Sequence, residues 1–369
     1  MDGNLYNAAM QQNTPQLPAI TLEVLSELMQ SWGIPKYRAK QVLQWRNKGI
    51  LNPIEMLNIP GELRERLSSS LICEPLQMVQ RQCSTDGTRK YLFMLTSGRL
   101  KGKMVESVYI PEEKRGTVCV SSQVGCVLDC PFCYTGTQGF EGNLTAGEIV
   151  AQILAVKHDL LTEPLPPELH ALVTHVVYMG MGEPLANEPG VHESLHILMD
   201  SDGLNLSRRR ITVSTSGLVP QIDRLSEVAP VNLAISLHAA ENGLRDELVP
   251  INRKYPLEEL RKCLNRYSLG KQRHITLEYV MLDGVNDRNK DIELLAGFVN
   301  SDRERVNLIS FNPYPGNSYE GSSTQRMNEF AKRLISKGIR ATVRRSRGQD
   351  IMAACGQLKA ESKPDNRES

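Results

Sequence analysis

The chain has 369 residues, of which 40% are hydrophobic and 23% are charged, a composition typical of a globular protein. Forty-three basic residues against 42 acidic ones give a formal net charge of +1, which excludes a uniformly basic nucleic-acid coat protein but not a local basic patch. No run approaches the ~18 uninterrupted apolar residues of a membrane span. No secretory signal is visible either, so we expect a cytoplasmic protein without a membrane partner. In a reducing compartment its eight cysteines are expected to be ligands, catalysts or core residues rather than a disulfide framework.

The first part of the chain predicts a small helical domain. Residues 1–17 are polar and predicted to be disordered, and residues 18–75 contain three short helical patterns. The second of these is basic, with Lys36, Arg38, Lys40, Arg46 and Lys48. Such a run is usually a solvated face, although it also suits an RNA-binding domain. Residues 76–111 combine β-rich runs with turn signals and predict a short β-rich linker region.

From residue 112 to residue 358, strand and helix patterns alternate. Strands are predicted at 117–122, 174–179, 210–215, 231–237, 274–281 and 305–311, with 339–344 as a candidate extension of the sheet. Amphipathic helices are predicted near 145–162, 189–200, 218–228, 256–268, 289–300 and 324–337. Six such units predict an α/β fold with a parallel sheet, either open and doubly wound or an incomplete barrel. Both arrangements place the site at the carboxyl ends of the strands. Residues 359–369 are predicted to form a disordered tail.

Three closely spaced cysteines follow the first strand of this repeat. Cys126, Cys130 and Cys133 have the pattern CxxxCxxC. Structural zinc sites and ferredoxin clusters both use four protein ligands, and no fourth is evident nearby. A cubane cluster held by three thiolates has one iron without a protein ligand, and that iron is free to bind another molecule. The spacing therefore indicates chemistry rather than electron storage, with three unimportant loop cysteines as the alternative.

This motif, with Phe132 before the third cysteine, resembles the radical S-adenosylmethionine (SAM) superfamily. In that superfamily the open iron of a [4Fe-4S] cluster chelates SAM, and the fold is an incomplete (β/α)6 barrel. MGMGEP at 179–184 resembles its glycine-rich SAM motif, where glycine lets the backbone approach the ligand closely. Tyr134 stands where a small residue is expected, which leaves the cluster ligands untouched.

A narrower resemblance runs from about residue 20 to residue 358. The motifs that carry it are CVSSQVGC at 119–126, FCYTGTQGF at 132–140, GMGEPL at 180–185, TVSTSG at 212–217, ISLHA at 235–239, EYVMLDGVND at 278–287, NPYPG at 312–316 and AACGQL at 353–358. All of them resemble the RlmN family, whose members methylate carbon 2 of an adenine in 23S ribosomal RNA and, in many bacteria, in transfer RNA.

The resemblance implies a route through two further cysteines. Carbon 2 of adenine is electrophilic, so a plain displacement on SAM cannot methylate it and a one-electron route is needed. In the implied order, one SAM methylates Cys355, and a second SAM is cleaved by the reduced cluster to a radical that takes a hydrogen from this methyl group. The methylene radical adds to the base, and a thiolate at Cys119 then attacks the sulfur of Cys355, releasing the product and leaving a disulfide. Cys73, Cys83 and Cys263 lack such context and are interpreted as structural.

The resemblance also assigns a base and a set of SAM-binding residues. Glu106 matches the family's proton acceptor, and a base is required because the hydrogen on carbon 2 must leave. The residues assigned to SAM binding stand at strand ends: Gly182, Glu183, Ser214, Ser236, Leu237, His238 and Asn312. Without the resemblance, Ser214 and Ser236 would be interpreted as helix caps. The cluster also requires an electron donor, such as flavodoxin with its reductase.

RNA contact is predicted from basic patches. Seven cations occupy one window without any acid: Lys332, Arg333, Lys337, Arg340, Arg344, Arg345 and Arg347. Arg208–Arg210 form another cluster before the third strand of the repeat. These patches are expected just ahead of Cys355 or at a barrel entrance, where phosphate contacts would position an unstacked base.

The sequence thus predicts a radical SAM adenine-C2 methyltransferase acting on 23S rRNA and tRNA. The expected architecture is a helical RNA-binding domain at 18–75, the β-rich linker region, and a partial (β/α)6 barrel at 112–358. The closest alternative is the related resistance enzyme that methylates carbon 8 of the same adenine. Two others are a non-catalytic Fe–S electron carrier and a nucleic-acid-binding module with structural zinc.

Overall fold

The computed structural model describes residues 14–166, 168–169, 172–270 and 273–360. The disorder predicted for residues 1–13 and 361–369 lies outside these ranges. Residues 14–17 differ from the prediction, because Gln16 pairs with Ile72 and the side chain of Leu17 is fully buried. Within the described ranges, no helix combines the length and the apolar character that crossing a bilayer demands.

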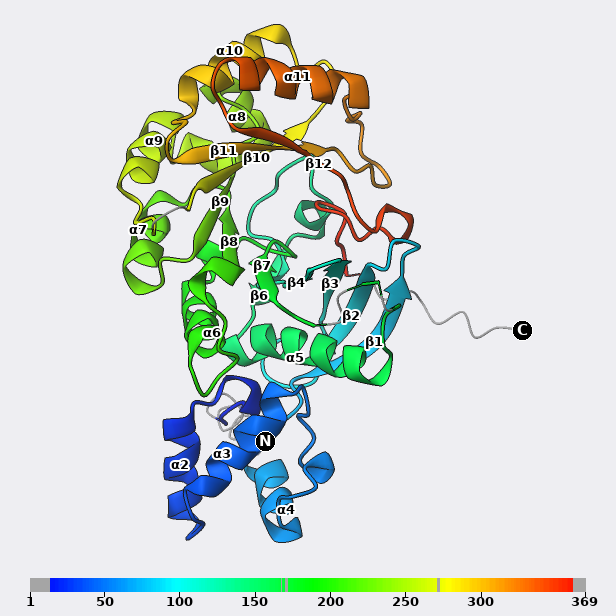
Figure 1. The fold of residues 1–369 in the computed structure, drawn as a ribbon, viewed down its shortest axis with the longest axis vertical. Helices are drawn as coiled ribbons and strands as arrows, with labels where there is room; N and C mark the ends of the chain where they lie inside the picture. Colours follow the sequence, from blue (N-terminus) through cyan, green and yellow to red (C-terminus); the bar gives the residue numbers. More distant parts are fainter. Residues whose placement is uncertain (1–13, 167, 170–171, 271–272, 361–369) are drawn as a thin grey trace, which may run out of the picture.

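A mixed sheet of ten strands forms the body of the molecule, in the order β1-β2-β3-β4-β7-β8-β9-β10-β11-β12 (Figure 1). Three antiparallel strands lie at one side: β1 (Leu76–Cys83), β2 (Arg89–Leu95) and β3 (Met104–Glu112). Seven parallel strands follow: β4 (Arg115–Cys119), β7 (His175–Tyr178), β8 (Ile211–Thr215), β9 (Asn232–Ser236), β10 (Ile275–Met281), β11 (Glu304–Ser310) and β12 (Ala341–Arg344). All the predicted parallel strands are therefore present, the candidate extension included. The β-rich region extends the same sheet, because β3 pairs with β4.

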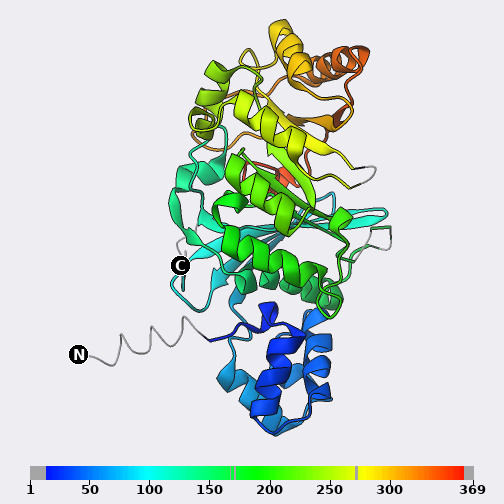
Figure 2. The same ribbon diagram turned by 90° about the vertical axis from the view of Figure 1, so that its left-hand side faces the viewer.

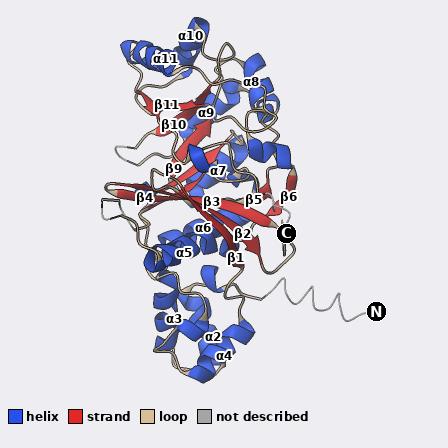
Figure 3. Cartoon of the chain, turned by 90° about the vertical axis from the view of Figure 1, so that its right-hand side faces the viewer, coloured by secondary structure: helices blue, strands red, loops and turns tan. Residues whose placement is uncertain are grey.

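The helices of the core connect successive parallel strands. They are α5 (Ala146–Thr162), α6 (Glu188–Met199), α7 (Val219–Val228), α8 (Asn242–Leu248), α9 (Leu257–Arg266), α10 (Asn289–Phe298) and α11 (Thr324–Ser336). Only the short α8 was not predicted. Because the strands follow in chain order and such crossovers are right-handed, the helices fall on one side of the sheet (Figures 1 and 3). This is an incomplete barrel; the doubly wound alternative is wrong, since its strand order would reverse.

Three helices form a layer beneath the core (Figure 2). They are α2 (Leu22–Ser31), α3 (Tyr37–Asn47) and α4 (Gly61–Ser70), as predicted. Their apolar side chains share one cluster with Val150 and Leu154 of α5 and Ile197 of α6, so the layer is packed directly on the barrel helices. The expectation that Arg46 belongs to a basic outer face is wrong. Arg46 is buried and donates to the carbonyl of Ile20 at 2.5 Å, inside the helical layer.

Candidate active site

A short hairpin presents the three-cysteine loop at the end of β4. Its strands are β5 (Gln123–Gly125) and β6 (Phe140–Asn143), which no sequence pattern predicted. Gly125 has a φ of +71°, and a Cβ at this position would lie 1.6 Å from the carbonyl oxygen of Gly139. Only glycine allows the two backbones to meet so closely, and this contact closes the loop.

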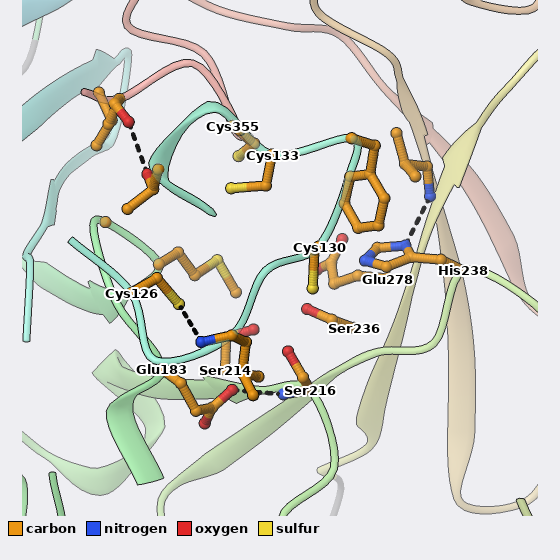
Figure 4. Close-up of a pocket in the computed structure, with 18 of the residues that line it drawn as sticks. Cys126, Cys130, Cys133, Glu183, Ser214, Ser216, Ser236, His238, Glu278 and Cys355 are labelled. Atoms are coloured by element: carbon orange, nitrogen blue, oxygen red, sulfur yellow. Dashed lines mark hydrogen bonds between the residues drawn. The ribbon is translucent and has the colours of Figure 1, made fainter. Parts of the chain in front are cut away.

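The sulfur atoms of Cys126, Cys130 and Cys133 face a common space (Figure 4). Burial raises the pKa of all three thiols, that of Cys126 to about 12, and the neighbouring thiols raise the pKa of Cys130 further. Three thiolates here need a compensating positive group. Among the described residues, no three His, Cys, Asp or Glu side chains are close enough to hold a single metal ion. A cubane binds each thiolate through a different iron, so the arrangement fits a cluster better than a structural zinc ion.

A pocket that is open to solvent at its mouth lies beside these thiols. It contains most of the predicted site residues: Cys126, Cys130, Cys133, Gly182, Glu183, Ser214, Ser236, His238, Asn312 and Cys355. The pocket lies at the carboxyl ends of the parallel strands, where barrel folds place their active sites. Three predicted residues, Glu106, Cys119 and Leu237, do not line it.

The turn after β7 closes one wall of the pocket. Gly182 has a φ of +93°, and a Cβ there would lie 2.5 Å from the Cβ of Gln123. The carboxylate of Glu183 is buried and accepts hydrogen bonds from the backbone N–H groups of Leu185 (3.1 Å) and Ser216 (2.8 Å). Glu183 therefore ties the end of β7 to the end of β8, while the backbone of the turn faces the ligand space.

Arg245, which sequence reasoning missed, holds the next two strand ends together. It is fully buried and donates to the carbonyls of Ser216 (2.7 Å), Ser236 (3.2 Å) and Leu237 (3.1 Å) and to Asn252 (2.8 Å). No motif points to it, since it lies on the unpredicted helix α8. In the described part of the chain the hydroxyls of Ser214 and Ser236 bond to no protein group, so both remain available to a ligand rather than capping a helix.

His238 enters the pocket from the end of β9. Its Nδ1 accepts the backbone N–H of Val280 at 3.0 Å, and its ring contacts Phe132 edge-on, with centroids 4.7 Å apart. Burial lowers the pKa of His238 to about 3, so the ring is neutral and carries its proton on Nε2. The neighbouring Leu237 has its side chain in the core, which limits any ligand contact from this residue to its backbone.

The loop that carries Cys355 is anchored on several sides. The carbonyl of Gly356 accepts from Tyr134 N–H (2.7 Å), and the carbonyl of Cys355 accepts from the Asn312 amide (3.1 Å). On the other side, the turn between β1 and β2 holds it through Ser84 and Asp350 (2.6 Å). Cys355 is exposed and lies on the pocket wall, far in sequence from the other thiols.

Cys119 and Glu106 lie beside the main pocket. Cys119 is buried at the end of β4 and lines a smaller chamber that Cys355 also borders. Glu106, on β3, pairs with Lys90 (3.1 Å), and its other oxygen accepts the backbone N–H of Lys359 (3.0 Å). The segment after Cys355 therefore covers the carboxylate of Glu106.

The remaining cysteines lie apart from the site, whereas Tyr134 lies beside it. Cys73 and Cys263 are buried, as expected of structural residues, whereas Cys83 is exposed at the end of β1. The ring of Tyr134 stacks on that of Tyr314, with ring centroids 4.6 Å apart. Its side chain therefore packs beside the cysteine loop and not between the three thiols.

Comparison with known proteins decides the family. Residues 16–73 match the family model described as the ribosomal RNA large subunit methyltransferase N-terminal domain, and residues 120–296 match the radical SAM superfamily. A dual-specificity RNA methyltransferase RlmN from Rhodopseudomonas palustris (strain BisB5) is 46% identical over 358 residues, covering 94% of this chain and 90% of the relative. Another, from Parvibaculum lavamentivorans, is 46% identical over 360 residues, with the same coverage.

A solved structure supports the same family assignment. The crystal structure of a radical SAM methyltransferase from Sphaerobacter thermophilus is 43% identical, with a TM-score of 0.87, and the match covers 94% of this chain and 100% of that chain. This chain belongs to the RlmN family. It is a radical SAM RNA methyltransferase that uses a [4Fe-4S] cluster and SAM. The electron-carrier and structural-zinc alternatives are therefore wrong.

The basic residues expected to bind RNA lie in different parts of the structure. Arg333 of α11 and Lys337, directly after that helix, pair with Glu293 of α10 at 3.6 and 2.7 Å, so these residues form a salt-bridged face. The expectation that Arg208–Arg210 stand at the barrel entrance is wrong. They precede β8, at the amino end of the parallel strands, whereas the pocket lies at the carboxyl end. Arg345, exposed directly after β12, is on the pocket side.

Proposed function

We propose that this enzyme methylates carbon 2 of an adenine in 23S rRNA and of an adenine in tRNA, with Cys355 as the carrier of the methyl group. The observation that carries the proposal is the position of Cys355 on the wall of the pocket that also contains the three-cysteine loop. Its relatives are named dual-specificity RNA methyltransferases, which supports two RNA substrates and favours carbon 2 over the carbon-8 alternative.

The pocket residues bind SAM in this proposal. Cys126, Cys130 and Cys133 hold the cluster, and the cluster with SAM supplies a hydrogen-abstracting radical when both are bound. The backbone at Gly182–Glu183 faces the amino-acid end of SAM. The polar groups offered to its ribose and adenine come from Ser214, Ser236, His238 Nε2–H, Asn312 and the backbone of Leu237.

Glu106 is proposed as the base that removes the proton from carbon 2 of the adenine. Its buried carboxylate is now bonded by Lys90 and by the backbone of Lys359. Since Lys359 follows Cys355 by only four residues, a movement of the Cys355 loop toward RNA would also uncover Glu106. The proposal therefore couples entry of the base to release of Lys359.

Cys119 is proposed to end the reaction by attacking the sulfur of Cys355. Both residues border the same small chamber, which supports a transient disulfide between them. The RNA substrates and the free thiols support a cytoplasmic location. Reduced flavodoxin with its reductase is the proposed electron donor.

Two alanine variants test this assignment. Cys355→Ala should keep its iron and cleave SAM weakly but transfer no methyl group to 23S or tRNA transcripts, because the carrier sulfur is gone. Cys119→Ala should instead accumulate a covalent protein–RNA adduct, visible as a slow band on a denaturing gel. Retained methylation by Cys355→Ala would refute the carrier role.

The position of the methyl group is tested in cells. Nucleoside mass spectrometry of 23S rRNA and tRNA, with and without the gene, should show loss of 2-methyladenosine from both. Loss of 8-methyladenosine would establish the carbon-8 alternative instead, and loss from only one RNA would refute dual specificity.

A further inference from the structure

The guanidinium of Arg344 occupies the boundary between the SAM pocket and the small chamber of Cys119. Arg344 is the last residue of β12, is half-buried, and lines both cavities together with Cys355. Across the described residues, its side chain has no hydrogen bond or ion pair with another protein group. A guanidinium carries five donors, so such a group is poised for a partner that forms during the reaction.

Four groups that can carry negative charge act on Arg344: Cys355, Glu278, Cys119 and Glu112. Cys355 is the strongest of them and raises the pKa of Arg344, followed by Glu278 and Cys119, while burial opposes the shift. The carboxylate of Glu278 already accepts a hydrogen bond from Asn307 at 2.9 Å. The sulfur of Cys119 accepts a hydrogen bond from the backbone of Met179, a neutral donor, so Arg344 is the cation that acts on this thiol.

Cys119 needs such a charge. Burial raises the pKa of its thiol to about 12, with Cys355 adding to the effect, whereas Arg344 acts in the opposite direction. A thiol with so high a pKa is almost entirely protonated at neutral pH and is a poor nucleophile. Arg347 also borders the chamber, but its guanidinium lies 3.6 Å from the carboxylate of Asp86.

We propose that Arg344 supplies the positive charge that stabilises the thiolate of Cys119 when it attacks Cys355. This inference rests on the proposed function, in which a methylene group links the sulfur of Cys355 to carbon 2 of the base. Cys119 Sγ first loses its proton to solvent. An S–S bond to Cys355 Sγ forms, the bond between that sulfur and the methylene carbon breaks, and its electron pair stays on carbon. A proton from water completes the methyl group. The two sulfurs lose the two electrons that the carbon gains, so no external oxidant is needed.

Single-turnover release of RNA from the adduct tests the role of this charge. At saturating RNA transcript and SAM, Arg344→Gln should form the adduct and release it about tenfold more slowly at neutral pH, the effect of one unit in the pKa of the thiol. The midpoint of its pH–rate profile should rise by about one unit or more. Arg344→Lys keeps the charge and should release RNA within a few-fold of the wild-type rate.

The matched control is Arg253→Gln, which removes a cation from an exposed position that lines neither cavity. It should leave the release rate at saturating RNA and the pH midpoint unchanged. Release by Arg344→Gln at the wild-type rate, a uniform slowing with an unchanged midpoint, or equal slowing by Lys and Gln would each overturn the inference.

Cys119→Ala separates this inference from the proposed function. If that variant accumulates adduct while Arg344→Gln releases normally, the role of Arg344 alone is refuted. If Cys119→Ala accumulates no adduct, the proposed function fails and the inference fails with it.

Discussion

His238 shows at the scale of one residue how the fold prepares a hydrogen-bond donor. Its φ of +57° is unusual for a residue other than glycine, and the bond from Val280 N–H to Nδ1 fixes the ring in this conformation. Because Nδ1 accepts, the proton of the neutral ring must be on Nε2. The strained backbone thus directs a donor into the pocket.

The same burial makes the free energy of unfolding depend on pH. The pKa of His238 is about 3 in the folded protein and near 6.5 when unfolded, so the unfolded state binds the extra proton between these values. Stability should therefore fall as pH drops below about 6.5, by up to ~1.4 kcal/mol per pH unit from this residue. Urea titrations of the apo-enzyme at pH 5, 6 and 7 measure the slope.

His238→Asn is the matched variant for that measurement. Asparagine tolerates a positive φ and can place an oxygen near the position of Nδ1, so the variant should fold. It should show a shallower decline between pH 7 and pH 5, whereas His196→Gln, at an exposed position, should not. An equal decline in all three proteins would assign the pH dependence to other groups.

Substitution of the buried Arg245 should lower the free energy of unfolding. Arg245→Met removes the donor shared by the buried carbonyl of Leu237 and the half-buried carbonyls of Ser216 and Ser236, and an unsatisfied buried carbonyl costs about 1–3 kcal/mol. We therefore expect a loss of about 2–3 kcal/mol of unfolding free energy, measured by urea denaturation. Arg224→Met breaks an exposed pair with Glu188 and should cost about 0–1 kcal/mol. Similar losses for the two variants would contradict the role given to Arg245.

At the scale of elements, the β5–β6 hairpin decides where the cluster cysteines lie. Gly125→Ala would place a Cβ 1.6 Å from the carbonyl of Gly139 and open the hairpin. We expect this variant to retain much less iron after anaerobic reconstitution, measured as iron per chain and as visible absorbance. Gly139→Ala meets nothing within 4 Å, but its φ of +76° with a ψ of 179° lies in a region nearly confined to glycine, so it should lose about 1–3 kcal/mol and keep its iron. Equal iron content in both variants would refute this steric account.

The elements that the sequence predicted are those with strong local patterns. The long helix α5 is capped by Thr145, as the capping box predicts. The hydroxyl of Thr145 accepts the backbone N–H of Glu148, and the carboxylate of Glu148 accepts the backbone N–H of Thr145. The parallel strands were evident from apolar runs between helices. The β5–β6 hairpin and α8 were missed because each has too few residues for a periodic pattern.

The candidate site divides in the same way. Cys126, Cys130, Cys133 and the Gly182–Glu183 turn are local motifs, so sequence alone could group them. Arg245 could not be found so, and Arg344 was expected in an RNA-contacting patch rather than on the pocket wall, because the positions of both depend on residues distant in the chain. The burial of Arg46 was hidden for the same reason, since its partner Ile20 is on another segment.

At the scale of the whole molecule, the position of the pocket determines which basic residues RNA can reach. The carboxyl ends of β7 to β12 surround the pocket, and Arg345 and Arg347 follow β12 at this end. Arg210 precedes β8, and four residues of strand, roughly 13 Å, separate it from Ser214 on the pocket wall. We therefore expect a base inserted into the pocket to bring its own phosphates toward Arg345 and Arg347 first.

Substitution of these two arginines tests that orientation. Arg345→Gln with Arg347→Gln should weaken binding to tRNA transcripts and lower the slope of log affinity against log salt by about 0.7 for each single-strand phosphate that the variant no longer neutralises. Cleavage of SAM without RNA should not change, because neither residue lines the SAM pocket. The matched control, Arg208→Gln with Arg209→Gln, removes the same charge from the amino end of β8 and should leave both affinity and slope nearly unchanged. Since both double variants change the net charge equally, a larger effect at Arg208 and Arg209 would mean that RNA wraps around the amino end of the barrel, and the approach inferred from the pocket would be wrong.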